Sequence, residues 1–364
     1  MSSSARPITH RYEDPLAQIW IRCAEQTGFR VVRSPEVFAS CDGAGTLLIG
    51  EAATLDADDS LGQMILHELC HALIEGDAGE ARPDWGLDNT SRRDTWHEHA
   101  CLRLQAYLAD RFGLRNFFAP TTMFRTRFWN TLPEDPFAAP ADQGGRREPS
   151  CVAARIGAWR AEQPRWSAPL DAALQATAAI ADALRNSVVQ APLGAVPGDQ
   201  AMPSLWQSAG LAPEQHPAGH APLAAYHPDR RCGDCAWGFR RGGGFRCRHR
   251  PDQGLRPEAP ACMRFEPADE LNCADCGACC REAYDAVELS PGDAVARRHP
   301  DLIIHGTRRK LRRNGTRCIA LQGGDTPTEA FLCRIYADRP RSCREFARGG
   351  ANCLDARRRV GLSL

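Results

Sequence analysis

Two histidines and a glutamate in residues 60–76, SLGQMILHELCHALIEG, have the spacing of a catalytic metal site. His67, Glu68 and His71 form an HExxH pattern. Residues four apart on a helix lie on one face, so the two imidazoles can bind one metal ion while the glutamate lies beside it. We predict His67 and His71 as metal ligands and Glu68 as the catalytic base that takes a proton from a metal-activated water.

The flanks of this pattern predict a buried helix. Ser60 followed three residues later by Gln63 is a capping box, and Gly76 suits a helix end. Large apolar residues occupy most sides of the helical wheel, which is typical of a helix inside a core. Unpaired polar groups in such a helix cost roughly 2–7 kcal/mol each, and a bound metal would remove that cost.

A second predicted helix, residues 94–112, has to supply a further ligand, because catalytic zinc needs a third protein ligand and an open position. Glu98 follows His71 by 27 residues and lies at the edge of the apolar stripe of this helix, so we predict Glu98 as the third ligand. His97 on the stripe, or another residue, is the alternative. We expect His99, on the opposite side of the helix, at the surface.

Two metal chemistries fit these residues. With zinc, two histidines and one glutamate support hydrolysis of a peptide bond, with Glu68 as general base. With iron(II), two histidines and one carboxylate form a facial triad that leaves positions open for oxygen. We predict a zincin-like metallopeptidase with zinc, or iron in its place, and keep a non-heme iron oxygenase as the alternative. A non-catalytic metal-binding or redox-sensing module is the third hypothesis.

Cysteine is the second unusual feature of the sequence. The chain has 17 cysteines, and 12 of them lie between Cys232 and Cys353. The N-terminus has no apolar stretch typical of a secretion signal, and no run of about 18 apolar residues occurs, so we expect a cytoplasmic protein without a membrane span. In a reducing compartment, clustered cysteines are interpreted as metal or redox ligands in preference to disulfides.

Four cysteines form a first module in residues 229–267. The predicted metal ligands are Cys232, Cys235, Cys247 and Cys262. Four thiolates fit a tetrahedral zinc site or an iron–sulfur site, with a disulfide pair or free thiols as the alternative. A short segment with few aliphatic residues cannot build a sufficient core, so we expect a metal to stabilise its fold. We expect His249, a spare donor, in solvent.

A denser group of eight cysteines follows in residues 268–364. They are Cys273, Cys276, Cys279, Cys280, Cys318, Cys333, Cys343 and Cys353. Side chains of adjacent residues point apart, so we expect Cys279 and Cys280 not to bind one ion together. This favours two metal sites, or a cluster with extra donors. Arginines near the late cysteines, such as Arg339 and Arg341, would favour the thiolate form.

The run CADCGACC, the pair Cys318-Ile319 and the segment CRIYADRPRSCREF closely resemble the YkgJ-like CxxCxxCC proteins, described as zinc- or iron-chelating cysteine cluster proteins. The resemblance covers residues 268–355. It implies that the cysteines of this group bind zinc, iron or an iron–sulfur cluster. The implied ligands are Cys273, Cys276, Cys279, Cys280, Cys318, Cys333 and Cys343, while Cys353 lies beyond the matching pattern. The resemblance implies no particular reaction.

The metal helix has a resemblance of its own. The segment HELCHALIEG, the following DWGLDN, Glu98 and LQAYL resemble the elongation factor P hydroxylase family, whose HExxH fold is zincin-like. This resemblance covers residues 60–112. It implies a zincin-like fold for the N-terminal part, the same metal ligands, and hydroxylation as the alternative activity.

Helix and strand patterns follow one another in an α+β order. Predicted helices lie at 13–27 and 151–189, and short predicted strands at 29–33, 36–39 and 46–49. We predict four parts: a zincin-like domain at 1–189 with the buried HExxH helix, a Pro/Gly/Ala-rich linker at 190–228, the four-cysteine module at 229–267 and the cysteine cluster domain at 268–364. We expect both cysteine-rich parts to be small, irregular and stabilised by metal.

Charge is unevenly distributed although it sums to zero. Residues 229–364 contain 26 Lys and Arg against 18 Asp and Glu, so the remainder of the chain is net negative by the same amount. The basic run 308–313 has no interleaved aromatic residues, so we expect a solvated surface there and no nucleic-acid partner. A protein or peptide substrate is the expected partner, and the sequence leaves the oligomeric state open.

Overall fold

The computed structural model describes residues 9–10, 12–138, 148–185, 205–207, 229–326 and 328–364. The chain forms two compact units. Unit 1 contains residues 1–86, 104–121 and 156–210, and unit 2 contains residues 87–103, 122–155 and 211–364. The predicted linker, 190–228, lies almost entirely outside the described residues, so the predicted domain boundaries stay predictions.

A small mixed sheet opens unit 1. Helix α1 (Pro15–Gln26) is followed by strands β1 (Arg30–Ser34), β2 (Ala39–Cys41) and β3 (Thr46–Gly50). Strand β3 is central, with β1 parallel on one side and β2 antiparallel on the other. Leu47 and Ile49, which share one face of β3, are fully buried. This face of the sheet therefore belongs to the core of the unit.

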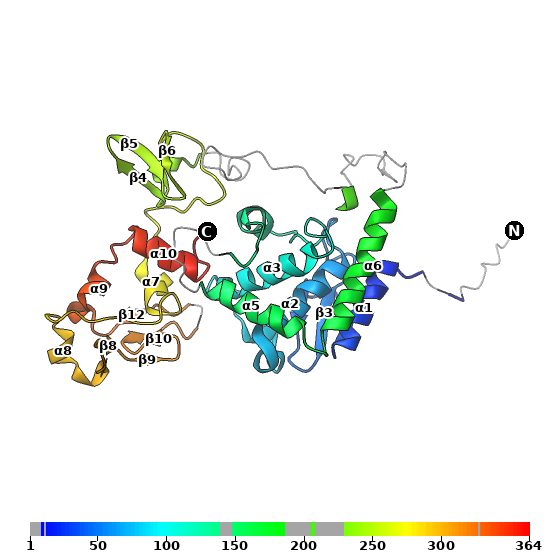
Figure 1. The fold of residues 1–364 in the computed structure, drawn as a ribbon, viewed down its shortest axis with the longest axis horizontal. Coiled ribbons are helices and arrows are strands. Elements are labelled where there is room, and N and C mark those ends of the chain that lie inside the picture. The colour runs from blue at the N-terminus through cyan, green and yellow to red at the C-terminus, as the bar shows by residue number, and fades with distance from the viewer. Residues whose placement is uncertain (1–8, 11, 139–147, 186–204, 208–228, 327) are drawn as a thin grey trace. The chain divides into compact units, whose positions relative to one another are not determined.

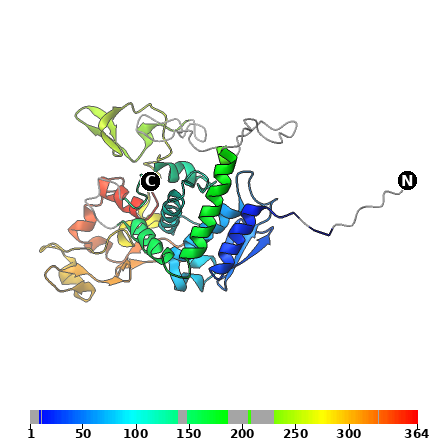
Figure 2. The same cartoon turned by 45° about the vertical axis from the view of Figure 1, so that its right-hand side comes forward.

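Three helices complete that core. Helix α1 packs against both α2 (Leu61–Glu80) and α6 (Ser167–Arg185). Figures 1 and 2 show α1 lying beside α6. Trp20 of α1 is fully buried, and its Nε1 donates to Thr177 Oγ1 at 3.1 Å. A Cβ at Gly62 of α2 would lie 2.7 Å from the Trp20 ring, so glycine is what allows the two helices to approach this closely.

Helix α3 (Thr95–Asp110) is one continuous helix, although the division between the units falls within it. It follows the short turn η1 (Asp84–Gly86). Helix α5 (Pro149–Ala161) comes before α6. The single helix predicted at 151–189 is therefore two helices, interrupted where Pro164 can donate no backbone hydrogen bond.

Unit 2 consists largely of short elements. The strands β4 (Gly238–Arg241), β5 (Gly244–Cys247) and β6 (Arg250–Leu255) form an antiparallel three-stranded sheet. The cysteine cluster part contains short helices, α7 (Cys273–Cys276), η6 (Ala278–Cys280), α8 (Val295–Arg298), η7 (Pro300–Leu302), η8 (Tyr336–Asp338), α9 (Arg341–Arg344) and α10 (Ala351–Arg359). It also contains two-residue strands, β7 (Ile303–Ile304), β8 (Lys310–Leu311), β9 (Arg313–Asn314), β10 (Arg317–Cys318), β11 (Leu321–Gln322) and β12 (Leu332–Cys333). Other short helices of the unit are α4 (Phe124–Arg127), η2 (Trp129–Thr131) and η5 (Cys232–Asp234).

The mixed helix and sheet content confirms the predicted α+β class in its coarse sense. The helices predicted at 13–27 and 94–112 are present as α1 and α3, with slightly shorter bounds. The zincin-like topology stays a prediction. Within the described residues, no helix combines the length and the apolar character that crossing a bilayer requires.

Candidate metal centres

Helix α2 begins with the predicted capping box. The Ser60 side chain accepts a hydrogen bond from the Gln63 backbone N at 3.2 Å, and Gln63 Oε1 accepts one from the Ser60 backbone N at 2.7 Å. Gln63 Nε2 also donates to the carbonyl of Phe117 at 2.7 Å. The start of the helix is thereby fixed, and His67 and His71 follow on one face.

Gly76 interrupts α2 where the sequence predicts its end. Its backbone has φ 64° and ψ −167°, a conformation open almost only to glycine. Arg160 Nη1 donates to the carbonyls of Leu73 and Ile74 at 2.6 and 2.7 Å. Carbonyls at a helix end lose their intrahelical donors, so Arg160 stabilises the turn that follows His71.

Gln105 of α3 fixes the orientation of His67. Gln105 Nε2 donates to the Phe118 carbonyl at 2.5 Å, so its Oε1 is the acceptor that lies 3.1 Å from His67 Nδ1. His67 Nδ1 therefore carries the proton, and Nε2 keeps the lone pair that a metal needs. A ligating histidine usually donates its other N–H to an oxygen in this way.

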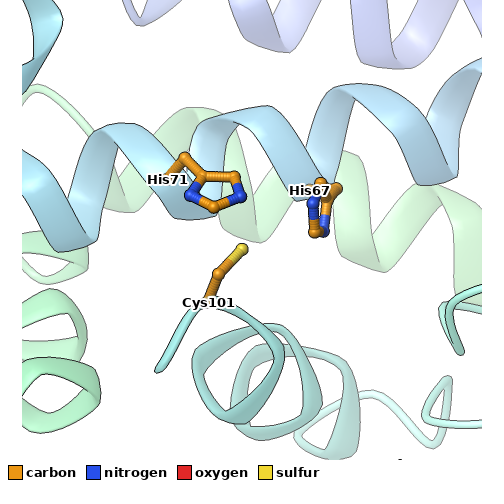
Figure 3. A group of neighbouring side chains, drawn as sticks. All are labelled: His67, His71 and Cys101. Carbon is orange, nitrogen blue, oxygen red and sulfur yellow. The ribbon is translucent and has the colours of Figure 1, made fainter. Parts of the chain in front are cut away.

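Cys101 of α3 forms a group of three donors with the two histidines (Figure 3). The ligand atoms of His67, His71 and Cys101 all lie within 4.8 Å of one another. Cys101 precedes Gln105 by one helical turn, so the face of α3 that orients His67 also presents the thiol. Ligands of one tetrahedral ion lie about 3.3–3.8 Å apart, so small side-chain rotations would bring these donors to a metal.

The third donor of this group differs from the predicted one. Within the described residues, no group of three close donors contains Glu98 or His97, and both side chains are half-buried on α3, one turn before Cys101. Glu98 as a ligand stays a prediction, whereas Cys101 is a residue that the sequence analysis missed. A signal was available, because Cys101 lies on the apolar stripe of the helix, where a thiol would face α2.

His99 is buried, and the prediction of a surface position is wrong. Its side chain stacks on Phe128 with ring centroids 3.9 Å apart, and Phe124 meets it edge to face. Residues 122–131 thus cover the side of α3 that the helical wheel assigns to solvent. Burial and, after it, the charge of Arg103 lower the pKa of His99 to about 3, so the ring is neutral at physiological pH.

Glu68 is buried beside the two histidines, on the same helix. Its Oε2 accepts a hydrogen bond from Trp85 Nε1 at 2.8 Å. Trp85 also lies nearly parallel to the His71 ring, with centroids 6.5 Å apart. The sequence analysis missed this contact, because Trp85 reaches Glu68 from the turn η1.

The turn η1 holds Trp85 in an unusual backbone conformation. Asp84 and Trp85 have φ values of 48° and 59°, the left-handed region that costs non-glycine residues about 1–2 kcal/mol each. Ser40 Oγ donates to Asp84 Oδ1 at 2.6 Å and ties the turn to strand β2. The surrounding structure therefore maintains a strained turn that places the indole against Glu68.

The eight cysteines of 268–364 begin on α7 and η6. Gly277, with φ 56°, connects these two helices, and a Cβ there would lie 2.7 Å from the Phe331 ring. The sulfurs of Cys279 and Cys280 are 3.9 Å apart, so the expectation that they point apart is wrong. The tight turn η6 brings them close to the separation of about 3.8 Å that two thiolates have on one zinc ion.

These cysteines have two neighbourhoods. In the first, Cys280, Cys333 and Cys343 pack against an apolar cluster that contains buried Cys318. In the second, Cys279 packs against a cluster that contains buried Cys276, although its charge also acts on Cys343. Cys353 and Cys273 belong with the second neighbourhood. Burial raises the pKa of Cys353 most, and the charges of Cys276 and Cys273 also raise it, which places these three cysteines near one another.

The thiol pKa values favour protonated sulfur when no cation is bound. Burial and, after it, the neighbouring Cys279 and Cys318 raise the pKa of Cys343 to about 12. In contrast, a hydrogen bond from Cys280 lowers the pKa of Cys279 to about 7. A bound metal ion would favour the thiolate form of each coordinating cysteine, since coordination deprotonates a thiol.

The four cysteines predicted in 229–267 also come together. Cys232, Cys235, Cys247 and Cys262 line one pocket. Thus the four cysteines of this module share one pocket, while the N-terminal group gains a thiol that spacing did not indicate.

Comparison with known proteins concerns the C-terminal part of the chain. Residues 272–358, a range that includes Cys353, match the CxxCxxCC family, described as a "putative zinc- or iron-chelating domain". The uncharacterized protein YkgJ of Escherichia coli O157:H7 is 36% identical over 107 residues, which cover 25% of this chain and 93% of that protein. No solved structure matches the chain. The resemblance predicted for the cysteine cluster is confirmed.

Proposed function

Because the chain belongs, through its C-terminal part, to the CxxCxxCC family that includes YkgJ, we propose that it is a metal-binding protein in which a zinc- or iron-chelating cysteine cluster accompanies a metal-dependent hydrolase site. One observation carries the hydrolase: the ligand atoms of His67, His71 and Cys101 lie within 4.8 Å of one another, next to buried Glu68. The matched relative is itself uncharacterized, so the reaction is argued from this site alone.

The site has the parts that amide hydrolysis needs. An ion held by three protein donors would keep a position for a water and a substrate carbonyl, and would lower the pKa of that water to about 7. Glu68 is the proton acceptor. Trp85 donates a hydrogen bond to Oε2 of Glu68. Oε1 is therefore the oxygen that takes the proton of the attacking water, and it then passes this proton to the leaving nitrogen.

The thiol favours hydrolysis over oxygenation. An iron(II) facial triad takes two histidines and one carboxylate, whereas the donor set brought together here contains Cys101 in place of the carboxylate. Thiolate is a softer ligand and suits zinc. We therefore expect a peptide or another amide as the substrate.

The cysteine cluster is proposed to hold its metal in two sets of thiolates. The first set is Cys280, Cys318, Cys333 and Cys343, and the second is Cys273, Cys276, Cys279 and Cys353. The packing of Cys280, Cys333 and Cys343 against the apolar cluster that contains Cys318 supports this division, as does the position of Cys353 near Cys276. Four thiolates complete a tetrahedral ion without an open position, so these sites would bind metal without catalysing hydrolysis.

The substitution Glu68→Gln tests the hydrolase. It keeps the hydrogen bond from Trp85 but removes the base, so we expect peptide hydrolysis to fall by about 10²–10⁴-fold while the metal at this site is retained. The measurement is cleavage of a pool of unstructured peptides by the full-length protein, read by mass spectrometry, together with elemental analysis of both proteins.

Asp77→Asn is the matched control, because Asp77 lies on the same helix but is exposed. It should leave hydrolysis unchanged. Equal turnover by wild type and Glu68→Gln would remove the general base. Product formation that requires oxygen and adds an oxygen atom to the peptide would instead establish the oxygenase.

A further inference from the structure

The four cysteines of residues 229–267 lie outside the range that matches the CxxCxxCC family. We propose that Cys232, Cys235, Cys247 and Cys262 bind one zinc ion in a closed, four-thiolate site that folds this segment, independently of the family's cluster. The proposal does not depend on the hydrolase site.

The pocket between these thiols is small. The four cysteines line one cavity of about 20 Å³, whose other walls include the rings of Trp237 and Phe245. A volume of about 10–15 Å³ is enough for one water molecule. The cavity therefore has room for a single ion, which favours one metal ion over an iron–sulfur cluster of several iron and sulfide atoms.

Backbone amides point at three of the four sulfurs. Cys235, Cys247 and Cys262 each receive a hydrogen bond from the amide two residues later, on Trp237, His249 and Arg264. An N–H group directed at sulfur stabilises negative charge on it. These amides offset part of the burial that raises the pKa of the three thiols.

The hairpins bring the two halves of the site together. Cys232 and Cys235 flank the tight turn η5 (Cys232–Asp234), and β4 pairs with β5 so that Gly238 lies opposite Cys247. A Cβ on Gly238 would lie 2.4 Å from the Phe245 ring, so glycine is required beside the pocket. At the other end, the Cys232 thiol donates to the carbonyl of Pro260 at 3.5 Å, two residues before Cys262.

Contacts to later residues hold part of the segment, because Trp237 shares an apolar cluster with Leu354, and Glu266 pairs with Arg357. Apart from cysteines, its buried apolar side chains are few, namely Ala236, Trp237, Ala259, Ala261 and Met263. Three of these are alanines, which bury little area. Segments this short generally need a metal or disulfides to be stable.

His249 also lines the pocket, but its ring and Nδ1 have other neighbours. Its ring packs on Trp237 with centroids 4.1 Å apart, and its Nδ1 faces Arg264 Nη1 at 3.1 Å. The expectation that His249 is solvated is wrong, because the side chain is half-buried against these neighbours. The thiols remain as the four donors.

Metal counting on the full-length protein tests the proposal. Cys247→Ser and Cys262→Ser should each lose one zinc equivalent by elemental analysis, and the double variant should also lose one, because both residues bind the same ion. Cys23→Ser, in buried α1, should lose none. A Cys280→Ser substitution combined with Cys262→Ser should lose more metal than Cys262→Ser alone, since the family's cluster is a separate site.

A second measurement on the wild-type protein avoids variants that fail to fold. A chelator should make the peptide bonds after Arg246 and Arg248, which are half-buried, cleavable by trypsin, and added zinc should restore their protection. Three results would overturn the proposal: unchanged zinc in Cys262→Ser, a disulfide among the four cysteines in native protein, or loss of iron and sulfide in place of zinc.

Discussion

Histidines in this chain perform different tasks because of their immediate partners. His67 is fixed as the Nδ1–H tautomer by Gln105, which leaves Nε2 for a metal. His99, two residues before Cys101 on the neighbouring helix, is stacked on Phe128 and kept neutral by burial. Within the described residues its Nε2 makes no hydrogen bond, so the ring behaves as an aromatic core residue.

His99 should make the stability of the protein depend on pH. Its pKa is about 3 in the folded state and near 6.5 when unfolded, so the unfolded state binds the extra proton between these values. The free energy of unfolding should therefore fall as pH drops below about 6.5, by up to about 1.4 kcal/mol per pH unit. In His99→Phe this contribution is absent, and the variant should be more stable than wild type by about 2 kcal/mol at pH 5.

Urea denaturation of both proteins between pH 4 and 8 measures the difference. His305→Gln is the control, because His305 is exposed and its removal should not change the slope. Parallel pH profiles for wild type and His99→Phe would show that the buried ring does not resist protonation.

The sequence could identify the site residues whose positions depend on a single helix. His67, Glu68 and His71 are set by the helical period, and the capping box at Ser60 by a local pattern. Cys101 and Trp85 could not be assigned, because their roles depend on which face of another element packs against α2. Neighbours in space, such as the sulfurs of Cys279 and Cys280, also depend on the local turn, which spacing alone does not reveal.

At the scale of the element, α2 shows how a metal helix is held at both ends. Ser60 and Gln63 fix its start, while Gly76 and Arg160 stabilise the turn after His71. The sequence predicted the start and the position of Gly76, since both are local signals. It could not predict Arg160, which reaches α2 from a helix 84 residues further along the chain.

Arg160→Leu should loosen this end of the helix. It leaves the carbonyls of Leu73 and Ile74 without their charged donor, so we expect a loss of about 2 kcal/mol in the free energy of unfolding. Metal affinity at His71 should fall as well. Denaturation and zinc titration measure the two effects. Arg155→Leu, exposed on the same helix α5, should change both only slightly, and an equal loss in the two variants would contradict the capping role.

At the scale of the whole chain, segments far apart in sequence share one buried charge network in unit 2. Glu148 lies 2.7 Å from Arg358 and 3.7 Å from Arg103, and all three side chains are buried. Arg358 belongs to α10, at the end of the family-matched range, and Arg103 to α3. The predicted division at 190–228 did not anticipate that residues 87–103 and 122–155 would join the same compact unit as the cysteine cluster.

Glu148→Gln should therefore destabilise unit 2 strongly. Removing the carboxylate takes from buried Arg103 the carboxylate that it faces and leaves Arg358 with Asp355, at a cost of about 3–5 kcal/mol. Chemical denaturation of the metal-loaded protein measures it. Glu345→Gln removes an exposed partner of Arg341 and should cost less than about 1 kcal/mol. Similar effects of the two substitutions would mean that the buried network is not what stabilises the unit.

The thiol at position 101 also defines a signature by which further proteins of this design could be found in genomes. A search for HExxH followed by a glutamate or a third histidine passes over such chains. Here the cysteine comes 30 residues after His71 and is followed four residues later by glutamine. Because Gln105 fixes the tautomer of His67 and shares a helix face with Cys101, the cysteine and the glutamine should occur together or be replaced together across related genes.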